Sequence, residues 1–238
     1  MTDHPVLESG RVAVVTGAAC GIGLAAAERF AARGMKLCLA DIDAGALEAA
    51  AAKVAGHARR PADVVSLPTD VSRLEDVRRL KERAYDAFGE VGLLMNNAGR
   101  EGGGGLFGET ERWHQIIDAN LWGVVHGAQV FGPAMVAQGT ACAIVNTGSK
   151  QGITCPPGDT AYNVSKAGIK VVTEALAHEL RSQPGCLVTA HLLIPGFTFT
   201  GFTRKRRRKA GGRLDTRTGR RLSAGRYGER RFLYSLPG

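Results

Sequence analysis

The stretch VVTGAACGIG, which spans Val14–Gly23, decides the fold of this 238-residue chain. It begins inside an apolar run that predicts a strand over Val12–Thr16, and the residues after it predict a helix over Gly23–Gly34 that ends at a glycine suited to a C-cap. The glycines between strand and helix follow a G-x-x-x-G-x-G spacing rather than the commoner G-x-G-x-x-G. Glycine permits a tight turn and lets the backbone approach a pyrophosphate, and the helix N-terminus behind it offers free N–H groups. The stretch therefore predicts a strand–turn–helix unit that binds a dinucleotide.

The alternation of short apolar runs and longer helical patterns continues along the chain. Further strands are predicted over Lys36–Ala40, Val64–Leu67, within Gly92–Gly99, and over Cys142–Thr147 and Leu187–Pro195. Helices are predicted over Ala44–Gly56, Arg73–Phe88, Glu111–Gln138, where Pro133 is expected to cause a bend, and Thr160–Leu180. Because the strands are almost continuously apolar, we expect a parallel sheet buried on both faces. The predicted fold is a single-domain α/β structure with a Rossmann-type, doubly wound parallel sheet.

Asp41 ends the second predicted strand, 18 residues beyond Gly23. A carboxylate at this position can accept hydrogen bonds from both hydroxyls of an adenosine ribose, and it would repel a 2′-phosphate. No Lys or Arg flanks Asp41, and Cys20 stands in the loop where a cation could meet that phosphate. The sequence therefore favours NAD over NADP. The alternative is that Asp41 caps the next helix, although Asp43 directly precedes the helical pattern and is the better cap candidate.

Tyr162 and Lys166 in the stretch YNVSK are four residues apart, so they share one face of a predicted helix. An ammonium near a tyrosine favours the phenolate and lowers the pKa of the hydroxyl from about 10, so Tyr162 is a candidate general acid or base. Ser149 follows the fifth strand at the carboxyl edge of the sheet, where its hydroxyl could hold the same substrate oxygen. A tyrosine and a lysine at this spacing also occur by chance on solvated helices. The nucleotide loop and the serine favour the catalytic interpretation.

The chain resembles the short-chain dehydrogenase/reductase family over about residues 8–203. The resemblance rests on TGAACGIG, NNAG, DANLWG, NTGSKQG, YNVSK and PG, which occur in this order. It implies that Tyr162 is the catalytic acid/base, that Lys166 tunes it and holds the nicotinamide ribose, that Ser149 orients the substrate carbonyl, and that Asn120 anchors a proton-relaying water. The implied cofactor contacts are Gly17, Cys20, Gly21, Ile22, Gly23, Asp41, Asp70, Val71, Asn97, Ala98, Tyr162, Lys166, Pro195, Gly196 and Thr200.

The resemblance also implies a reaction and an assembly. We expect hydride transfer between NAD and a secondary alcohol or ketone, in a homodimer or homotetramer built partly from the long helices beside strands four and five. Two features near the site leave alternatives open. The aromatic residues Phe197, Phe199 and Phe202 are either a substrate lid or ordinary packing, and Gly102–Gly105 is either a mobile rim loop or a long turn.

Composition excludes several other classes of protein. The N-terminus has neither a cationic start nor an apolar core, and no apolar run approaches the ~20 residues of a membrane span. The five cysteines are scattered and the six histidines lack ligand spacing, so we expect a cytoplasmic protein without a metal site or a membrane partner. The net charge of +9 arises from the end of the chain, because residues 204–238 hold 13 of the 31 Lys and Arg and 2 of the 22 Asp and Glu.

This basic tail allows two interpretations. In one, its arginines and its aromatic residues Tyr227, Phe232 and Tyr234 bind nucleic acid, a partner that the rest of the chain disfavours. In the other, which we favour, the domain covers residues 1–203, and residues 204–238 are an aberrant, disordered or frameshifted tail that replaces the last helix and a seventh strand. Synonymous codons for Arg213–Pro237, read one nucleotide later, spell GWTPEQVVDFLLAAMASGDFYILC, which contains a capped helix and a strand.

For the function of the whole chain, an enzyme and a nucleic-acid-binding protein are the first two hypotheses. The third is a relative of the enzymes that binds the cofactor but is catalytically impaired.

Overall fold

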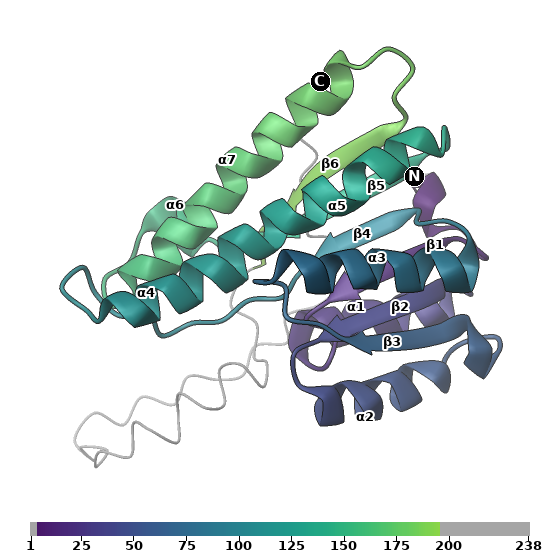
Figure 1. The fold of residues 1–238 in the computed structure, drawn as a ribbon, viewed down its shortest axis with the longest axis horizontal. Helices are drawn as coiled ribbons and strands as arrows, with labels where there is room; N and C mark the ends of the chain where they lie inside the picture. The colour runs from purple at the N-terminus through teal and green to yellow at the C-terminus, as the bar shows by residue number, and fades with distance from the viewer. Residues whose placement is uncertain (1–3, 196–238) are drawn as a thin grey trace, which may run out of the picture.

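The computed structural model describes residues 4–195 and contains a parallel sheet at its centre (Figure 1). Its strands are β1 (Val12–Thr16), β2 (Lys36–Asp41), β3 (Val64–Pro68), β4 (Leu93–Asn96), β5 (Cys142–Thr147) and β6 (Val188–Leu193). They lie in the order β3-β2-β1-β4-β5-β6, and every neighbouring pair is parallel. This strand order is that of a doubly wound Rossmann-type sheet, so the predicted fold class is confirmed.

The helices follow the predicted alternation. They are α1 (Gly21–Ala32), α2 (Ala44–Ala55), α3 (Leu74–Phe88), α4 (Thr110–Ile117), α5 (Gly123–Ala137), α6 (Gln151–Thr154) and α7 (Thr160–Ser182), with short 3-10 turns η1 (Pro5–Leu7) and η2 (Pro61–Asp63). The residues predicted to cap the start of α2 and to follow the end of α1 are found in these places. Asp43 caps α2 by accepting a hydrogen bond from the N–H of Ala46 at 3.0 Å, and Gly34 follows α1 with a φ of +79°.

One predicted helix differs from the structure. The pattern over Glu111–Gln138 predicts a single helix, but the structure divides it into α4, a π-helical segment η3 (Asp118–Trp122) and α5. The interruption lies at η3, whereas Pro133 lies inside α5. The short helix α6 was not predicted.

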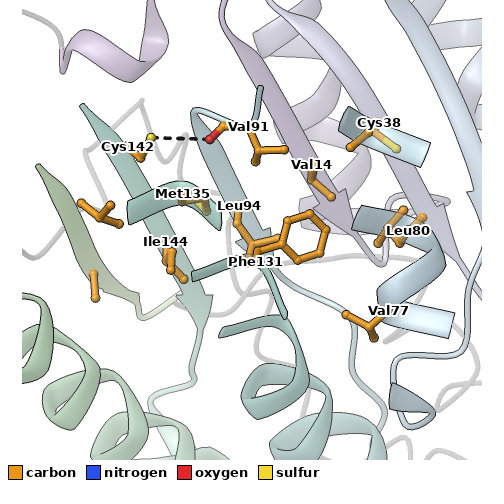
Figure 2. Close-up of a cluster of buried hydrophobic side chains, with 14 of the residues drawn as sticks. Val14, Cys38, Val77, Leu80, Val91, Leu94, Phe131, Met135, Cys142 and Ile144 are labelled. Atoms are coloured by element: carbon orange, nitrogen blue, oxygen red, sulfur yellow. Dashed lines mark hydrogen bonds between the residues drawn. The ribbon is translucent and has the colours of Figure 1, made fainter. Parts of the chain in front are cut away.

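Two apolar clusters cover the two faces of the sheet. Side chains alternate along β1, so Val14 belongs to the cluster beneath α3, α5 and α7, while Ala13 and Val15 belong to the cluster beneath α1 and α2. Figure 2 shows the first cluster, in which Phe131 of α5 lies beside Leu94 of β4. Both clusters consist mainly of aliphatic side chains with little or no exposed surface, which fixes the strands and therefore the loops at their carboxyl ends.

The prediction of strands buried on both faces is wrong for the two edge strands, since β3 has no buried residue and β6 is buried on one face. Along β6, Val188, Ala190 and Leu192 are buried, whereas Thr189 is exposed and His191 is half-buried. This alternation is typical of a strand with one covered face. The residues expected to lack the last helix and seventh strand, 204–238, lie outside the described part of the chain, as does the tail hypothesis.

The sheet order creates a switch point beside β1. The chain builds outward from β1 through β2 and β3, and then returns to the other side of β1 to add β4. In an open α/β sheet, the crevice at such a point, outside the carboxyl ends of the strands, is where ligands bind. The predicted site residues Gly17, Asp41, Asn97 and Ser149 all follow or end strands at this edge.

Candidate active site

The loop between β1 and α1 requires its glycines. Gly17 and Gly21 have φ angles of +64° and +61°, in the left-handed region that other residues rarely adopt. A Cβ added to Gly23 would clash with the main-chain oxygen of Gly17, and one added to Gly17 would lie 2.8 Å from the Cα of Ala98. The loop therefore passes close to Ala98, two residues beyond β4, and leads into the N-terminus of α1. Cys20 is the residue before α1 and is exposed, and Ile22 is half-buried.

Asp41 lies against this loop. The N–H of Ala18 donates to the oxygen of Ala40 at 3.0 Å, and the N–H of Ala19 donates to Asp41 Oδ2 at 3.0 Å. The other carboxylate oxygen, Oδ1, accepts from the N–H of Asp43 at 3.2 Å. Each carboxylate oxygen can accept more than one hydrogen bond, so acceptor capacity remains for ribose hydroxyls. Because Asp43 caps α2, capping does not explain the placement of Asp41.

The segment after β4 is held beside the glycine loop by Thr16. The hydroxyl of Thr16 accepts hydrogen bonds from the N–H of Asn97 at 3.0 Å and the N–H of Ala98 at 3.1 Å. The side-chain amide of Asn97 donates to the main-chain oxygens of Thr16 and Gly17 at 3.0 and 3.2 Å. The structure thus brings the predicted residues Asn97 and Ala98 against the predicted nucleotide loop.

Asp70 and Val71 lie at the same edge, directly after β3. The N–H of Thr69 donates to the main-chain oxygen of Asp41 at 2.9 Å, which brings this segment beside the end of β2. Asp70 Oδ1 accepts from the hydroxyl of Ser72 at 2.6 Å, and Val71 is buried. The glycine turn, the carboxylate of Asp41 and these flanking segments together offer groups of the kind that hold a dinucleotide.

Tyr162 and Lys166 occupy the first two turns of α7, and both are buried. The ammonium of Lys166 donates to the main-chain oxygen of Thr147 at 2.8 Å, at the end of β5. Its nitrogen lies 5.6 Å from the centroid of the Tyr162 ring. Ser149, two residues beyond β5, lies near enough to Tyr162 for its side chain to lower the pKa of the tyrosine. The predicted serine, tyrosine and lysine therefore meet at one place on the sheet edge.

The protonation of this group differs from the prediction. Burial raises the pKa of Tyr162 above its ordinary value, the Ser149 side chain opposes the rise, and the charges of Glu101 and Asp159 add to it. Burial also lowers the pKa of Lys166 to about 8, against the opposite effect of Glu101. The expectation that Lys166 lowers the pKa of Tyr162 is thus wrong for these residues taken alone. Desolvation of the phenolate is the largest effect on this pKa.

Asn120 lies in the π-helical segment η3 and is fully buried. Its Oδ1 accepts from the N–H of Arg100 at 2.7 Å, and its Nδ2 donates to the oxygen of Arg100 and to the hydroxyl of Ser165, each at 3.0 Å. Single π turns inside helices often accompany functional sites. Here the π turn places Asn120 between α7 and the segment after β4. Its partner in that segment, Arg100, is the residue after Gly99.

Sequence reasoning missed three contributors to this arrangement. The main-chain oxygen of Thr147 holds Lys166, and a main-chain acceptor leaves no signal in the residue type. Ser165 bonds Asn120, and its place beside Lys166 in YNVSK is the signal that could have found it. Asp159 caps α7, accepting from the N–H of Tyr162 at 3.4 Å, and it stands three residues before the tyrosine, as a capping residue should.

The closing segment is described only at its start. Pro195 is half-buried and lies just beyond β6, whereas Gly196 and Thr200 lie outside the described residues, as do Phe197, Phe199 and Phe202. Over residues 4–195, no three His, Cys, Asp or Glu side chains group as a metal site would require. No helix in this same part of the chain has the length and apolarity needed to cross a membrane.

Comparison with known proteins identifies the family. A model of the short chain dehydrogenase family matches residues 11–211. The chain belongs to the short-chain dehydrogenase family. A member from Burkholderia phymatum, solved in complex with NAD, is 39% identical, with a TM-score of 0.79 over 93% of this chain and 76% of that one. The match confirms both the family and the fold expected from the motifs.

Curated short-chain dehydrogenases give the same result. The 1-deoxy-11-beta-hydroxypentalenate dehydrogenase of Streptomyces exfoliatus is 36% identical over 189 residues, which cover 78% of this chain and 66% of that enzyme. The chain therefore spans slightly less than two thirds of this relative. The 3-oxoacyl-acyl-carrier-protein reductase of Thermotoga maritima is 33% identical over 202 residues, 84% of this chain and 79% of that enzyme.

Proposed function

We propose that this short-chain dehydrogenase transfers a hydride between NAD and a secondary alcohol or ketone, with Tyr162 as the general acid/base. The observation that carries the proposal is the meeting of Ser149, Tyr162 and Lys166 at the carboxyl edge of the sheet. The Ser149 side chain, just beyond β5, lowers the pKa of Tyr162, and the Lys166 ammonium lies 5.6 Å from the centroid of the Tyr162 ring. The curated relatives described above are a dehydrogenase and a reductase, in agreement with this chemistry.

NAD is the proposed cofactor, and its nicotinamide supplies or accepts the hydride. Gly17, Gly21 and Gly23 would let the backbone approach the pyrophosphate, and Asp41 would accept hydrogen bonds from the adenosine ribose. A carboxylate at this position repels the 2′-phosphate of NADP. The relative from Burkholderia phymatum was solved with NAD, which supports the same choice.

The side chains divide the remaining work. In ketone reduction, Tyr162 would donate its proton to the carbonyl oxygen that Ser149 orients, and in alcohol oxidation it would accept that proton. Lys166, whose pKa is about 8, would hold the nicotinamide ribose and stabilise negative charge on the tyrosine oxygen. Asn120, fixed by Arg100 and Ser165, would anchor the water that returns the proton to solvent.

The proposal extends to assembly and location. We propose a homodimer or homotetramer that uses α5 and α7, and a cytoplasmic protein whose cysteines are thiols, since none of the described cysteines forms a disulfide. The relatives described above are oxidoreductases, so none of them favours the nucleic-acid hypothesis, and the basic tail lies outside the described residues.

The test uses the full-length chain and a variant ending at residue 203. Each is titrated with NAD and NADP, and turnover is then measured on a panel of secondary alcohols and ketones. We expect tighter binding of NAD and measurable turnover on at least one class of substrate. Binding of NAD without turnover on any substrate would instead favour the catalytically impaired relative. Tighter binding of NADP would overturn the cofactor assignment.

A further inference from the structure

Asp159 connects the catalytic helix to the glycine-rich segment at the rim of the site. One carboxylate oxygen, Oδ1, accepts from the N–H of Tyr162 in the first turn of α7 at 3.4 Å. The other, Oδ2, accepts from the N–H of Gly102 at 2.8 Å. The two bonded residues are far apart in the sequence, so this single carboxylate joins two separate parts of the active site. Neither bond belongs to the fold's regular secondary structure.

Residues 102–105 pack closely against the same end of α7. The N–H of Thr160 donates to the oxygen of Gly104 at 2.9 Å. A Cβ added to Gly103 would lie 2.5 Å from the Cβ of Ala161 and 2.8 Å from Ile116, so only glycine fits there. On the other side, the indole N–H of Trp113 donates to the oxygen of Gly105 at 3.1 Å. These contacts therefore hold residues 102–105 against α7 and α4 in the structure.

The packing continues directly to the tyrosine. Ile116, Ala161 and Tyr162 form one buried cluster, with Trp113 against it. A displacement of residues 102–105 would move Gly103 relative to Ala161, the neighbour of Tyr162 in the chain. The first turn of α7, which carries Tyr162, is therefore packed against this segment through Ala161.

Charges around Tyr162 give the link a measurable signature. Asp159 faces it from the helix start and Glu101 from the rim segment, and both raise the pKa of Tyr162. Lys166 lies on its own helix, 5.6 Å from the ring, and Lys150 beside Ser149 is exposed. Trp113 and Ile116, the contacts from α4, carry no charge. Neutralising Asp159 removes one of the two negative charges that disfavour the phenolate.

We propose that Asp159 is a positioning residue of the reaction, which ties the segment 102–105 to the first turn of α7 and so holds Tyr162 in place relative to Ser149. The proposal rests on the proposed function for the identity of the reaction. The bridge itself is a property of the protein without substrate, so it can be tested separately.

The first experiment compares Asp159→Asn with Asp43→Asn. Asparagine is as good a helix cap as aspartate, but it has a single acceptor oxygen and so cannot accept from both Gly102 and Tyr162. Asp43 is the matched control because it also caps a helix, α2, by accepting from the N–H three residues later, that of Ala46. Hydrogen–deuterium exchange of the full chain, read by mass spectrometry, should be about tenfold faster at residues 102–105 in Asp159→Asn, as expected for a lost charge-assisted hydrogen bond. Unchanged exchange there would overturn the proposal.

The second readout is the pH profile of kcat/KM for alcohol oxidation. Because Asp159 disfavours the phenolate, its neutralisation should move the acid limb to lower pH, while the misplaced hydroxyl should lower kcat several-fold. Asp43→Asn should leave both unchanged. Faster exchange with an unaltered profile and kcat would also overturn the positioning role, because the bridge would then be structural only. If Asp159→Asn does not fold, Asp159→Ser replaces it in both experiments, because serine keeps a capping oxygen.

The two failures are distinguishable. If the wild-type chain turns over no alcohol or ketone, the proposed function fails, and the exchange experiment still decides whether the bridge exists. If the wild type is active and Asp159→Asn matches it in exchange and in pH profile, only the positioning role fails.

Discussion

The hydroxyl of Tyr162 is subject to opposing effects, since burial raises its pKa and the Ser149 side chain lowers it. We expect Tyr162→Phe to reduce turnover by roughly 10²–10⁴-fold, the usual contribution of a general acid or base. Affinity for NAD should stay nearly intact, because the phenyl ring can still pack against Ile116 and Ala161. Steady-state kinetics and a cofactor titration measure the two effects. Turnover close to that of the wild type would refute the role of Tyr162.

The buried Lys166 makes stability depend on pH. Its pKa is about 8 in the folded protein against an ordinary 10.5, so between these pH values the unfolded chain binds more protons and the folded state gains stability as pH rises. Lys166→Met lacks this gain. From about pH 8 to about pH 10, the free energy of unfolding of the wild type should rise relative to Lys166→Met by on the order of 2 kcal/mol. Urea denaturation at both pH values provides the measurement. If the free energy of unfolding changed equally with pH in the two proteins, the lowered pKa of Lys166 would be contradicted.

Cofactor choice is expected to depend on Asp41. Asp41→Ala removes the acceptor at the adenosine ribose, and the loss of a charge-assisted hydrogen-bond pair should weaken NAD binding by on the order of 1.5–3 kcal/mol. The ratio of NAD affinity to NADP affinity should fall, because the negative charge that repels the 2′-phosphate is gone. Competitive titration of NAD and NADP compares the variant with the wild type. A wild type that prefers NADP would show that the role assigned to Asp41 is wrong.

Among the elements, the strand–turn–helix around β1 and α1 is the least tolerant of change. A Cβ at Gly23 would clash with the main chain of Gly17, which cannot move aside as a flexible side chain could. We expect Gly23→Ala to abolish measurable NAD binding through a displaced α1 N-terminus. Gly45 in α2 is the matched control, because the nearest atom to its added Cβ is 3.8 Å away. Gly45→Ala, at the second residue of α2, should bind NAD normally. Equal NAD affinity in the two variants, measured by titration, would contradict this account.

The sequence predicted helices and strands correctly where residues close together in the chain determine them. The apolar run Cys142–Thr147 is a strand with the predicted limits, and Asp43 caps α2 as its position indicates. The break in the helix over Glu111–Gln138 could not be predicted in this way. It lies at Asn120, whose partners Arg100 and Ser165 are distant in sequence. The pKa of Tyr162 was missed for the same reason, because burial is a property of the assembled fold.

For the whole molecule, the division into a domain over residues 1–203 and an aberrant tail over 204–238 stays a prediction. The coding DNA tests it. We expect the frame one nucleotide later to be open across the codons for Arg213–Pro237 and to encode a capped helix and a strand. Restoring that frame should raise both turnover and thermal stability, because the folded domain would regain apolar elements to bury. Stop codons in the alternative frame would exclude the accident and leave a basic arm.

The return of the chain to β1 has a consequence during synthesis. β1 is completed by β4, with Ala13 opposite Leu93, so one edge of the central strand has no partner until that later segment has left the ribosome. At the usual speed of translation this interval is on the order of ten seconds. Throughout it, the nascent chain presents an unpaired apolar strand, the kind of surface that chaperones bind and that pairs wrongly with other chains. The yield of native protein should therefore depend on how fast the codons between the two strands are read.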